Sequence, residues 1–249
     1  MILEGKRILV TGASRGIGRA MAKAAALEGA TVGVHYHSGE NEAHQLCAEI
    51  EAEVGRKAHP IFFDVRSPSE VESGVERFQE IAGGIDALVN NAARFEAGLL
   101  ASMETDAIQR LISINLEGPI YTARAVLPYF LQQRSGVILN IGSVSASRPN
   151  QGQSVYAATK CALEGFTRAL AIEYARKKIR VLCLSPGPID TEMMANTRAL
   201  VGDRIESRVP LGRVGQPIEV AQFAVQLLSD RMSFATGSIY SFDGGYLLG

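Results

Sequence analysis

Residues 7–18 read Arg-Ile-Leu-Val-Thr-Gly-Ala-Ser-Arg-Gly-Ile-Gly, a short apolar run followed at once by glycines in a G-x-x-x-G-x-G pattern. The run Arg7–Val10 predicts a β-strand, and Ala20, Met21 and Ala24 beyond the glycines predict a helix. A glycine-rich turn between a strand and a helix lets backbone N–H groups and the helix N-terminus approach a pyrophosphate. Because glycines also serve tight turns without any ligand, the motif favours a dinucleotide site without establishing it.

The same alternation of strand and helix patterns continues along the chain. Apolar runs typical of buried strands lie at residues 7–10, 31–34, 61–63, 87–89, 136–139, 181–184 and 238–240. Helix-length segments include residues 18–28, 40–54, 69–82 and 154–177. Continuously apolar strands separated by helices indicate a parallel sheet with both faces covered. The predicted fold class is α/β: one Rossmann-like, doubly wound parallel sheet of about seven strands in a single domain spanning residues 1–249.

Residues 186–213 form the least regular part of the chain, rich in Pro, Gly, Met and charged residues. Because this part follows a strand, it is placed to fold over a ligand, which predicts a substrate lid over residues 188–213. A surface insertion explains the same composition equally well.

Composition excludes several classes of function. The 249 residues are 47% hydrophobic and 20% charged, with a formal net charge of −1 and no basic stripe that could follow a nucleic acid. Cys47, Cys161 and Cys183 are far apart, which predicts reduced packing residues rather than disulfides or a zinc site. His35 and His37 lack carboxylate or thiolate neighbours, so we expect exposed side chains and no metal. The N-terminus resembles a strand rather than a signal sequence, and no apolar run reaches about 18 residues, so we expect a cytoplasmic protein without membrane contact.

The segment Tyr-Ala-Ala-Thr-Lys at residues 156–160 contains the most informative polar pair. On a helix, its i,i+4 spacing places the phenol of Tyr156 and the ammonium of Lys160 on one face. The positive charge, joined by that of an oxidised nicotinamide ring, is expected to lower the tyrosine pKa from about 10, so that Tyr156 donates a proton in reduction and accepts one in oxidation. A half-buried tyrosine beside a solvated lysine is the alternative. Ser143, at the end of an apolar run, offers a hydroxyl to a substrate oxygen, as Ser145 and Ser147 nearby also would.

Three motifs together resemble the short-chain dehydrogenase/reductase family over essentially the whole chain. They are the G-x-x-x-G-x-G turn, Asn90-Asn91-Ala92 after the fourth apolar run, and Gly-Ser followed by Tyr-x-x-x-Lys. The resemblance selects Ser143 to orient and stabilise the substrate oxygen, Tyr156 as acid and base, and Lys160 to lower its pKa and orient the cofactor. It also implies that Asn115 supports a water relay, where a packing or helix-bending asparagine is the alternative.

The resemblance further implies a nicotinamide cofactor along the carboxyl edge of the sheet. Asp64 is expected to close the third strand and contact the adenine, with a turn cap as the alternative. Ala93 replaces the glycine usual in the family and is expected to narrow the nicotinamide side slightly. The predicted cofactor-binding residues are Gly12, Ser14, Arg15, Gly16, Ile17, Gly18, Tyr36, His37, Ser38, Asp64, Val65, Asn91, Ala92, Ala93, Tyr156, Lys160, Pro186, Gly187, Ile189 and Thr191.

The choice between NAD and NADP depends on the charge beside the ribose. NAD-preferring relatives usually carry an acid at the end of the second strand, where this chain has Tyr36. Arg15 supplies a cation suited to a 2′-phosphate, and His37 supplies a partial one near neutral pH. NADP is therefore the predicted cofactor, in preference to NAD.

Within the family, the chain most resembles the 3-oxoacyl-acyl-carrier-protein reductases. In those enzymes basic residues at the positions of Arg134 and near Lys177 meet the acidic carrier protein, and Arg176 and Lys178 extend this basic character. Basic residues near a helix C-terminus also complement its dipole while remaining solvated. The resemblance implies NADPH-dependent reduction of a 3-oxoacyl thioester to the 3-hydroxyacyl thioester, in fatty acid biosynthesis, by a homotetramer.

Two other functions stay open. The first is an NAD(P)-dependent sugar or secondary-alcohol dehydrogenase of the same family. The second, from another class, is a catalytically idle dinucleotide-binding sensor, whose discriminating feature would be a broken catalytic set. The set in this chain is intact, which favours an enzyme.

Overall fold

The computed structural model describes residues 1–194 and 205–249. Seven parallel strands form one sheet in the order β3-β2-β1-β4-β5-β6-β7. The strands are β1 (Arg7–Val10), β2 (Thr31–Tyr36), β3 (Ala58–Phe62), β4 (Ala87–Asn90), β5 (Gly136–Ile141), β6 (Ile179–Pro186) and β7 (Ile239–Phe242). The strand order reverses between β1 and β4, and open α/β sheets bind ligands at the carboxyl ends of the strands at such a point.

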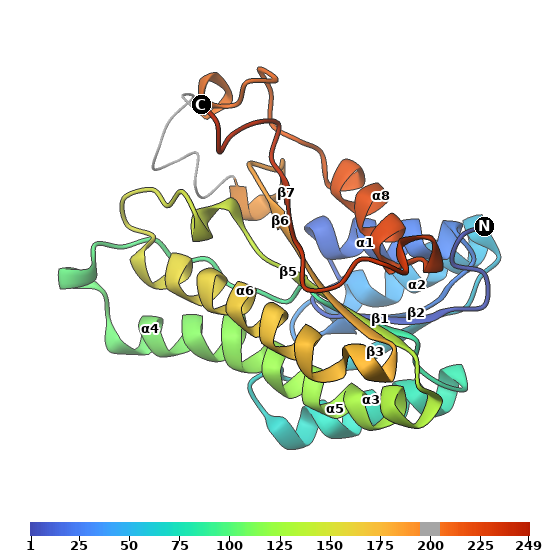
Figure 1. The fold of residues 1–249 in the computed structure, drawn as a ribbon. Coiled ribbons are helices and arrows are strands. Elements are labelled where there is room, and N and C mark those ends of the chain that lie inside the picture. The colour runs from blue at the N-terminus through green and yellow to red at the C-terminus, as the bar shows by residue number, and fades with distance from the viewer. Residues whose placement is uncertain (195–204) are drawn as a thin grey trace.

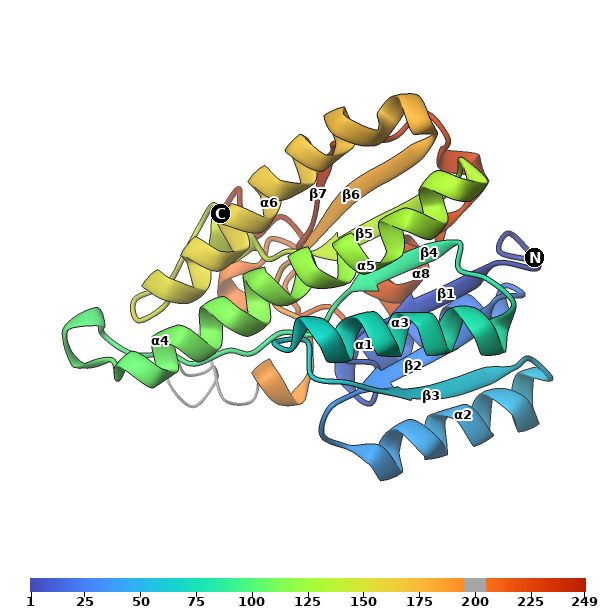
Figure 2. The ribbon, with the colours of Figure 1, turned by 90° about the horizontal axis from the view of Figure 1, so that it is seen from below.

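Helices cover both faces of the sheet (Figures 1 and 2). One face carries α1 (Gly16–Leu27), α2 (Glu40–Val54) and α8 (Pro217–Leu228). The other carries α3 (Pro68–Ala82), α4 (Thr105–Ile112), α5 (Gly118–Gln133) and α6 (Ser154–Tyr174), with a π-helical turn, Ser113–Glu117, joining α4 to α5. This arrangement confirms the predicted fold class.

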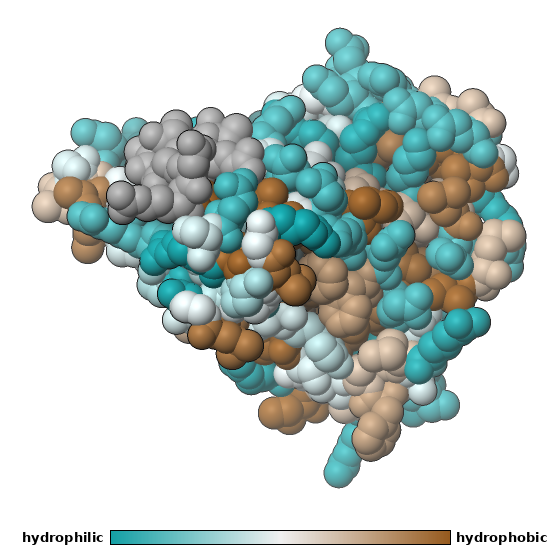
Figure 3. Space-filling view, turned by 90° about the horizontal axis from the view of Figure 1, so that it is seen from above, coloured by the Kyte–Doolittle hydropathy of each residue, from teal (hydrophilic) through white to brown (hydrophobic). Residues whose placement is uncertain are grey.

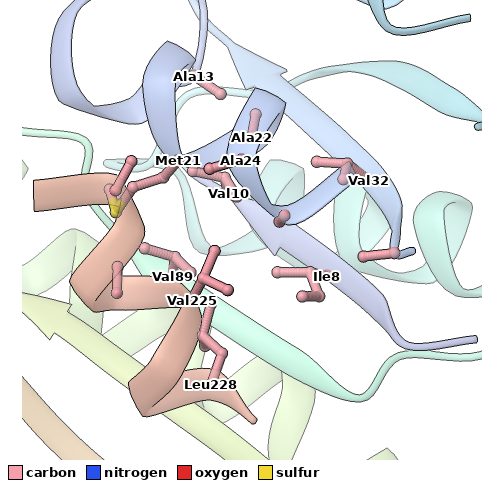
Figure 4. Close-up of a cluster of buried hydrophobic side chains, with 14 of the residues drawn as sticks. Ile8, Val10, Ala13, Met21, Ala22, Ala24, Val32, Val89, Val225 and Leu228 are labelled. Carbon is pink, nitrogen blue, oxygen red and sulfur yellow. The ribbon is translucent and has the colours of Figure 1, made fainter. Parts of the chain in front are cut away.

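Each face of the sheet has its own apolar core. On the face of α1, the side chains of Met21, Val225 and Leu228 pack over Ile8 and Val10 of the central strand (Figure 4). Small buried alanines on α1 let this helix approach the sheet and α8 closely. The central strands are thereby held rigidly, and their carboxyl ends form a firm base for a site.

The boundaries of the third strand differ from the prediction. The predicted strand, 61–63, overlaps only the end of the observed one, because β3 runs Ala58–Phe62 and so begins three residues earlier and ends one residue earlier. Ala58 and Pro60 are poor strand formers, yet β3 is an edge strand, where a residue without an N–H donor is tolerated. Asp64 therefore lies in the loop beyond the strand instead of closing it.

Two predicted helices also have different ends. The first helix begins at Gly16 rather than residue 18, so the last two glycines of the motif are already helical. The long helix predicted over 154–177 ends at Tyr174 and continues as a 3-10 turn, Ala175–Lys177. Lys178 then takes a left-handed φ of 61°, which stops the helical path.

The surface departs from expectation at one cysteine. Cys47 and Cys183 are buried, as predicted for packing residues, whereas Cys161 is exposed on α6 because it lies on the face turned away from the sheet. Apolar and polar side chains alternate over the upper face of the molecule (Figure 3). Among the described helices, none combines the length and apolar character needed to cross a bilayer.

Candidate active site

The glycine turn between β1 and α1 forms one wall of a cavity of about 490 Å³. Gly12 and Gly16 have φ angles of 61° and 58°, in the left-handed region that favours glycine. A β-carbon at Gly12 would lie 2.9 Å from the Cα of Ala92, and one at Gly18 would overlap the carbonyl oxygen of Gly12. The turn thus presents bare backbone to the cavity. No described side chain caps the first N–H groups of α1, an arrangement that fits a pyrophosphate.

His35 supports this turn from behind. Its Nδ1 accepts a hydrogen bond from the N–H of Gly12, and its Nε2 donates to the carbonyl oxygen of Phe63, both at 2.9 Å. Burial lowers the pKa of His35 to about 4, so the ring is neutral, as accepting at Nδ1 requires. The prediction that His35 is exposed is wrong, because the side chain is 2% exposed beneath the turn. His37, whose side chain is 53% exposed, lies at the surface as predicted.

We expect the buried His35 to make stability depend on pH. The unfolded chain binds the proton near pH 6.5 and the folded chain near pH 4, so the unfolded state binds more protons between these values. The free energy of unfolding therefore falls as the pH drops through this window, by about 3 kcal/mol from this group. The measurement is urea unfolding of the wild type and of His35→Asn between pH 7 and pH 4.

A matched control for this experiment is His44→Asn, at a histidine whose side chain is 57% exposed on α2. The control should keep the wild-type slope, and His35→Asn should flatten it. Equal slopes in the wild type and His35→Asn would contradict the prediction.

Asn91 holds the same turn from the neighbouring strand. Its Nδ2 donates to the carbonyl oxygens of Thr11 and Gly12, both at 2.9 Å. The Thr11 hydroxyl accepts from the N–H groups of Asn91 and Ala92 at 2.9 and 3.0 Å. The end of β1 is therefore tied to the loop after β4 where the strand order reverses. Thr11 was not predicted as a site residue, because its partners follow from the strand order and not from its own motif.

The loops after β2 and β3 form the end of the cavity expected to hold the adenosine. Tyr36 ends β2, and its hydroxyl donates to Glu40 at 3.4 Å. Asp64 accepts from Nη2 of Arg66 at 2.6 Å and lies 3.7 Å from Nε2 of His37. Burial raises the pKa of Asp64, but Arg66 and His37 lower it further, so the carboxylate stays charged. Arg66 also lines the cavity and was missed, although its place two residues after Asp64 was a usable signal.

Ser143, Tyr156 and Lys160 converge at the other end of the cavity. Ser143 follows β5, while Tyr156 and Lys160 lie on one face of the first turns of α6. Nζ of Lys160 donates to the carbonyl oxygen of Ile141 at 2.7 Å and lies 5.8 Å from the centroid of the Tyr156 ring. Tyr156 and Lys160 are 8% and 3% exposed, so the alternative of a solvated lysine does not hold.

Burial governs the acidity of this pair. It raises the pKa of Tyr156 to about 12, against a smaller lowering by the hydrogen bond with Ser143. It lowers the pKa of Lys160 to about 8. The prediction that Lys160 lowers the tyrosine pKa is therefore wrong for the protein atoms alone. The ammonium is directed to the carbonyl of Ile141, and desolvation of the phenolate outweighs its charge.

Asn115 lies behind the catalytic face, in the π-helical turn between α4 and α5. Its Oδ1 accepts from the N–H of Arg94 at 2.8 Å, and its Nδ2 donates to the carbonyl oxygen of Arg94 at 2.9 Å. A longer bond of 3.4 Å joins Nδ2 to Oγ1 of Thr159 on α6. The side chain thus fixes the loop after Asn91 against α6, which agrees with the packing role given as the alternative.

The loop after β6 closes the far wall. Gly187 donates to the carbonyl oxygen of Phe242 at 3.0 Å, and Ile189 forms a parallel bridge with Gly215. Thr191 then lies beside the glycine turn. A β-carbon placed at Gly16 would be 3.7 Å from Cγ2 of Thr191. The described ends of the predicted lid, 188–194 and 205–213, both contribute to the cavity wall, and its remaining residues, 195–204, lie outside the described part.

The cavity gathers the predicted catalytic and cofactor-binding residues with two exceptions. Gly18 lies behind the turn, where its lack of a side chain lets Gly12 and Asn91 pack closely against it. Asn115 does not line the cavity itself but hydrogen-bonds the backbone of Arg94, which does. The other lining residues lie largely on the substrate side. Four of them, Met193, Met194, Ile205 and Arg208, belong to the predicted lid, whereas the rest were not named as site residues: Arg94, Phe95, Arg110, Ile114, Asn150, Gln153 and Tyr246. They come from several distant segments, so no single motif contains them.

The predicted carrier-docking residues lie elsewhere. Arg134 caps α5 with a left-handed φ of 52°, and Arg176, Lys177 and Lys178 follow α6. All four are exposed. They stand where helices return to the amino ends of β5 and β6, whereas the cavity lies at the carboxyl ends. The structure therefore does not bring them to the cavity of their own chain.

A phosphate-binding turn at the strand reversal, in one cavity with a half-buried serine and a buried tyrosine and lysine, is the site of a nicotinamide-dependent oxidoreductase acting on carbonyl or hydroxyl groups. A family model described as enoyl-(acyl carrier protein) reductase matches residues 12–247. The chain belongs to the short-chain dehydrogenase/reductase family.

Relatives and solved structures agree with this assignment. The chain is 39% identical over 248 residues to a 3-oxoacyl-(acyl-carrier-protein) reductase of Thermotoga maritima, covering all of both chains. It is 38% identical over 248 residues to the enzyme of the same name from Escherichia coli K12, covering 98% of each. A short-chain dehydrogenase from Burkholderia cenocepacia, solved in complex with NADP, superposes with a TM-score of 0.91 at 35% identity, covering 99% of this chain and 100% of that one.

Proposed function

We propose that this enzyme uses NADPH to reduce a 3-oxoacyl thioester to the 3-hydroxyacyl thioester. The observation that carries the proposal is the convergence of Ser143, Tyr156 and Lys160 at the end of a cavity that begins at the glycine turn. Beyond these residues the wall combines polar side chains with an apolar set, which comprises Phe95, Ile114, Met193, Met194, Ile205 and Tyr246. The apolar set suits an acyl chain better than a sugar, whose hydroxyl groups need polar partners.

Each polar residue then has a defined task. NADPH, when bound, supplies the hydride that the carbonyl carbon receives. Tyr156 donates its phenolic proton to the carbonyl oxygen, and its raised pKa keeps that proton available at neutral pH. Ser143 donates a hydrogen bond to the same oxygen and orients it. Lys160 orients the cofactor and, with Asn115, supports the return of a proton to Tyr156 through water.

Arg15 and the absence of an acid at Tyr36 support NADP as the cofactor, as does the NADP complex of the Burkholderia relative. Arg15 projects from the glycine turn with its side chain 71% exposed, and its Nη1 lies 3.4 Å from Glu192. A surface pair of this kind contributes little to stability, so the guanidinium is available to a 2′-phosphate.

Arg15→Ala should weaken NADPH binding by about tenfold and leave NADH binding nearly unchanged, because only NADPH carries the 2′-phosphate that a guanidinium binds. Fluorescence titration with each cofactor measures both affinities. Arg19→Ala is the matched control, since Arg19 lies one turn further along α1 and pairs with Glu49 at 2.6 Å. An equal loss of affinity for NADPH and NADH would show that Arg15 does not contribute to the preference for NADPH.

A substrate panel with NADPH tests the function itself. The expected order places 3-oxoacyl thioesters above free sugars and small secondary alcohols in kcat/KM. Activity on thioesters at or below that on sugars and alcohols would favour the alternative dehydrogenase. Protein that binds NADPH but oxidises none of it with any ketone or thioester would favour the sensor.

The proposal also includes a substrate delivered by an acyl carrier protein and an enzyme assembled as a homotetramer. Carrier docking at the predicted residues depends on the assembly. Arg176 lies twenty residues beyond Tyr156, which corresponds to about 30 Å of helix at 1.5 Å per residue. A carrier docked at Arg134 and Lys177 would therefore stand far from the cavity of the same chain. Docking through these residues requires a neighbouring subunit whose cavity opens beside them.

A further inference from the structure

Two arginines on the substrate side of the cavity share one carboxylate. Arg94 is ion-paired to Glu96 through Nε, and Arg110, in the last turn of α4, reaches the two oxygens of Glu96 at 3.3 and 3.4 Å. Burial raises the pKa of Glu96, but the bonds from both arginines lower it further, so the carboxylate is charged. Two positive charges thus face one negative charge, and the cluster has a net positive charge.

The lining of the whole cavity also has a net positive charge. Its described lining contains six basic residues and two acidic ones, although the chain has a formal net charge of −1. The basic residues are Arg15, Arg66, Arg94, Arg110, Lys160 and Arg208, and the acidic ones are Asp64 and Glu192. Arg15 and Arg66 lie at the adenosine end and Lys160 at the reacting centre. The other three, Arg94, Arg110 and Arg208, supply the positive charge on the substrate side.

The position of Arg94 ties this cluster to the reacting centre. Asn115 holds the Arg94 backbone through two hydrogen bonds of 2.8 and 2.9 Å. The next residue, Phe95, packs edge-on against the ring of Tyr156, with 5.1 Å between ring centroids. The loop continues to Gly98, whose N–H donates to the carbonyl of Gly152 at 2.9 Å. The cluster is therefore fixed beside Tyr156 and apart from the glycine turn.

Both guanidinium groups remain open to a ligand. The side chains of Arg94 and Arg110 are 52% and 40% exposed, and the bonds from Arg110 to Glu96 are at the long end of the normal range. Arg208, also on the cavity wall, donates to the neutral amide oxygen of Asn150 at 2.8 Å. Arg110 and Arg208 can exchange these contacts for an oxyanion at little cost, whereas Arg94 keeps its close pair with Glu96 through Nε and offers its two Nη groups, because guanidinium groups bind carboxylate and phosphate with two parallel donors.

We propose that Arg94 and Arg110 form a subsite for an oxyanion carried by the substrate, with Glu96 holding the two guanidinium groups in place until the anion arrives. The proposal rests on the proposed function, because it assigns a recognition element to the same substrate. The oxyanion is either the phosphate of the arm that bears the thioester or a carboxylate of the acyl group. Both present the same chemistry to a pair of guanidinium groups.

The test measures binding without turnover. Two matched pairs of probes, 4′-phosphopantetheine with pantetheine and the 1-methyl ester of 3-oxohexanedioate with its dimethyl ester, are titrated calorimetrically into protein saturated with NADP. Saturation keeps the probes away from the cofactor's phosphate contacts. At least one anionic probe should bind about tenfold more tightly than its neutral partner, and the pair that shows the preference identifies the phosphate or the carboxylate.

Substitutions of charged residues show which side chains cause the tighter binding of the anionic probes. Arg94→Gln and Arg110→Gln should each reduce it to below about threefold, while Glu96→Gln, which removes the competing carboxylate, should strengthen anion binding. Arg56→Gln is the control, since Arg56 pairs with Glu4 at 2.8 Å and does not line the cavity. Equal binding within both probe pairs, or a preference that survives both arginine substitutions, would overturn the subsite.

This outcome is separable from that of the proposed function. Failure of the proposed function appears as absent turnover of 3-oxoacyl thioesters in the substrate panel. Failure of the subsite appears in the binding of non-reacting probes.

Discussion

Tyr156→Phe is expected to lower the rate of ketone reduction by about 10³-fold while leaving the affinity for NADPH nearly unchanged. The substitution removes only the hydroxyl group, so the ring keeps its packing against Phe95, 5.1 Å away between centroids. What is lost is the proton donor that Ser143 orients. Single-turnover oxidation of NADPH measures the chemical step, and fluorescence titration measures cofactor binding.

Tyr121→Phe is the matched control, because Tyr121 lies on α5 and does not line the cavity. It should keep the wild-type rate and affinity. Ser143→Ala should also slow reduction, by a smaller factor, since a hydrogen bond is lost but the acid remains. A Tyr156→Phe enzyme that retained even a tenth of the wild-type rate would exclude Tyr156 as the proton donor.

The fold could be predicted because its signals are local. Buried parallel strands are apolar runs, and the glycine turn at residues 11–18 is contiguous in sequence. The prediction was less accurate where tertiary position overrides local propensity. Pro60 fits β3 only because that strand lies at the sheet edge, and the first helix begins inside the glycine motif, at Gly16, which itself has a left-handed φ of 58°.

Only the site residues that belong to sequence motifs could be predicted. Ser143, Tyr156 and Lys160 belong to motifs that the family resemblance selects, and the structure brings them together. Arg110 and His35 carry no such signal, because their roles come from contacts with Glu96 and with the N–H of Gly12.

Acidity was the property that the sequence predicted worst. A neighbouring lysine lowers a tyrosine pKa only where the attraction of its charge for the phenolate exceeds the cost of burying that phenolate. Both are buried, and the lysine is directed to a backbone carbonyl. Desolvation therefore decides the direction of the shift in each group.

Lys160→Met should lower the rate of reduction by about 10²-fold or more and, unlike Tyr156→Phe, should also weaken NADPH binding. Methionine preserves much of the buried stem, so the change isolates the ammonium group. Nζ donates to the carbonyl of Ile141 at 2.7 Å and stands 5.8 Å from the phenol ring, between the cofactor end and the acid. In the proposed mechanism, its loss removes both a cofactor contact and the charge that helps return a proton to Tyr156.

The double variant Tyr156→Phe/Lys160→Met separates these two tasks. If Lys160 affects the chemical step through Tyr156, the double variant should reduce as slowly as Tyr156→Phe alone, because the group through which Lys160 acts is already absent. Its NADPH affinity should instead match that of Lys160→Met. Rate losses that multiply in the double variant would show that Lys160 acts on the substrate independently. Cofactor affinity unchanged in Lys160→Met would confine its role to the proton path.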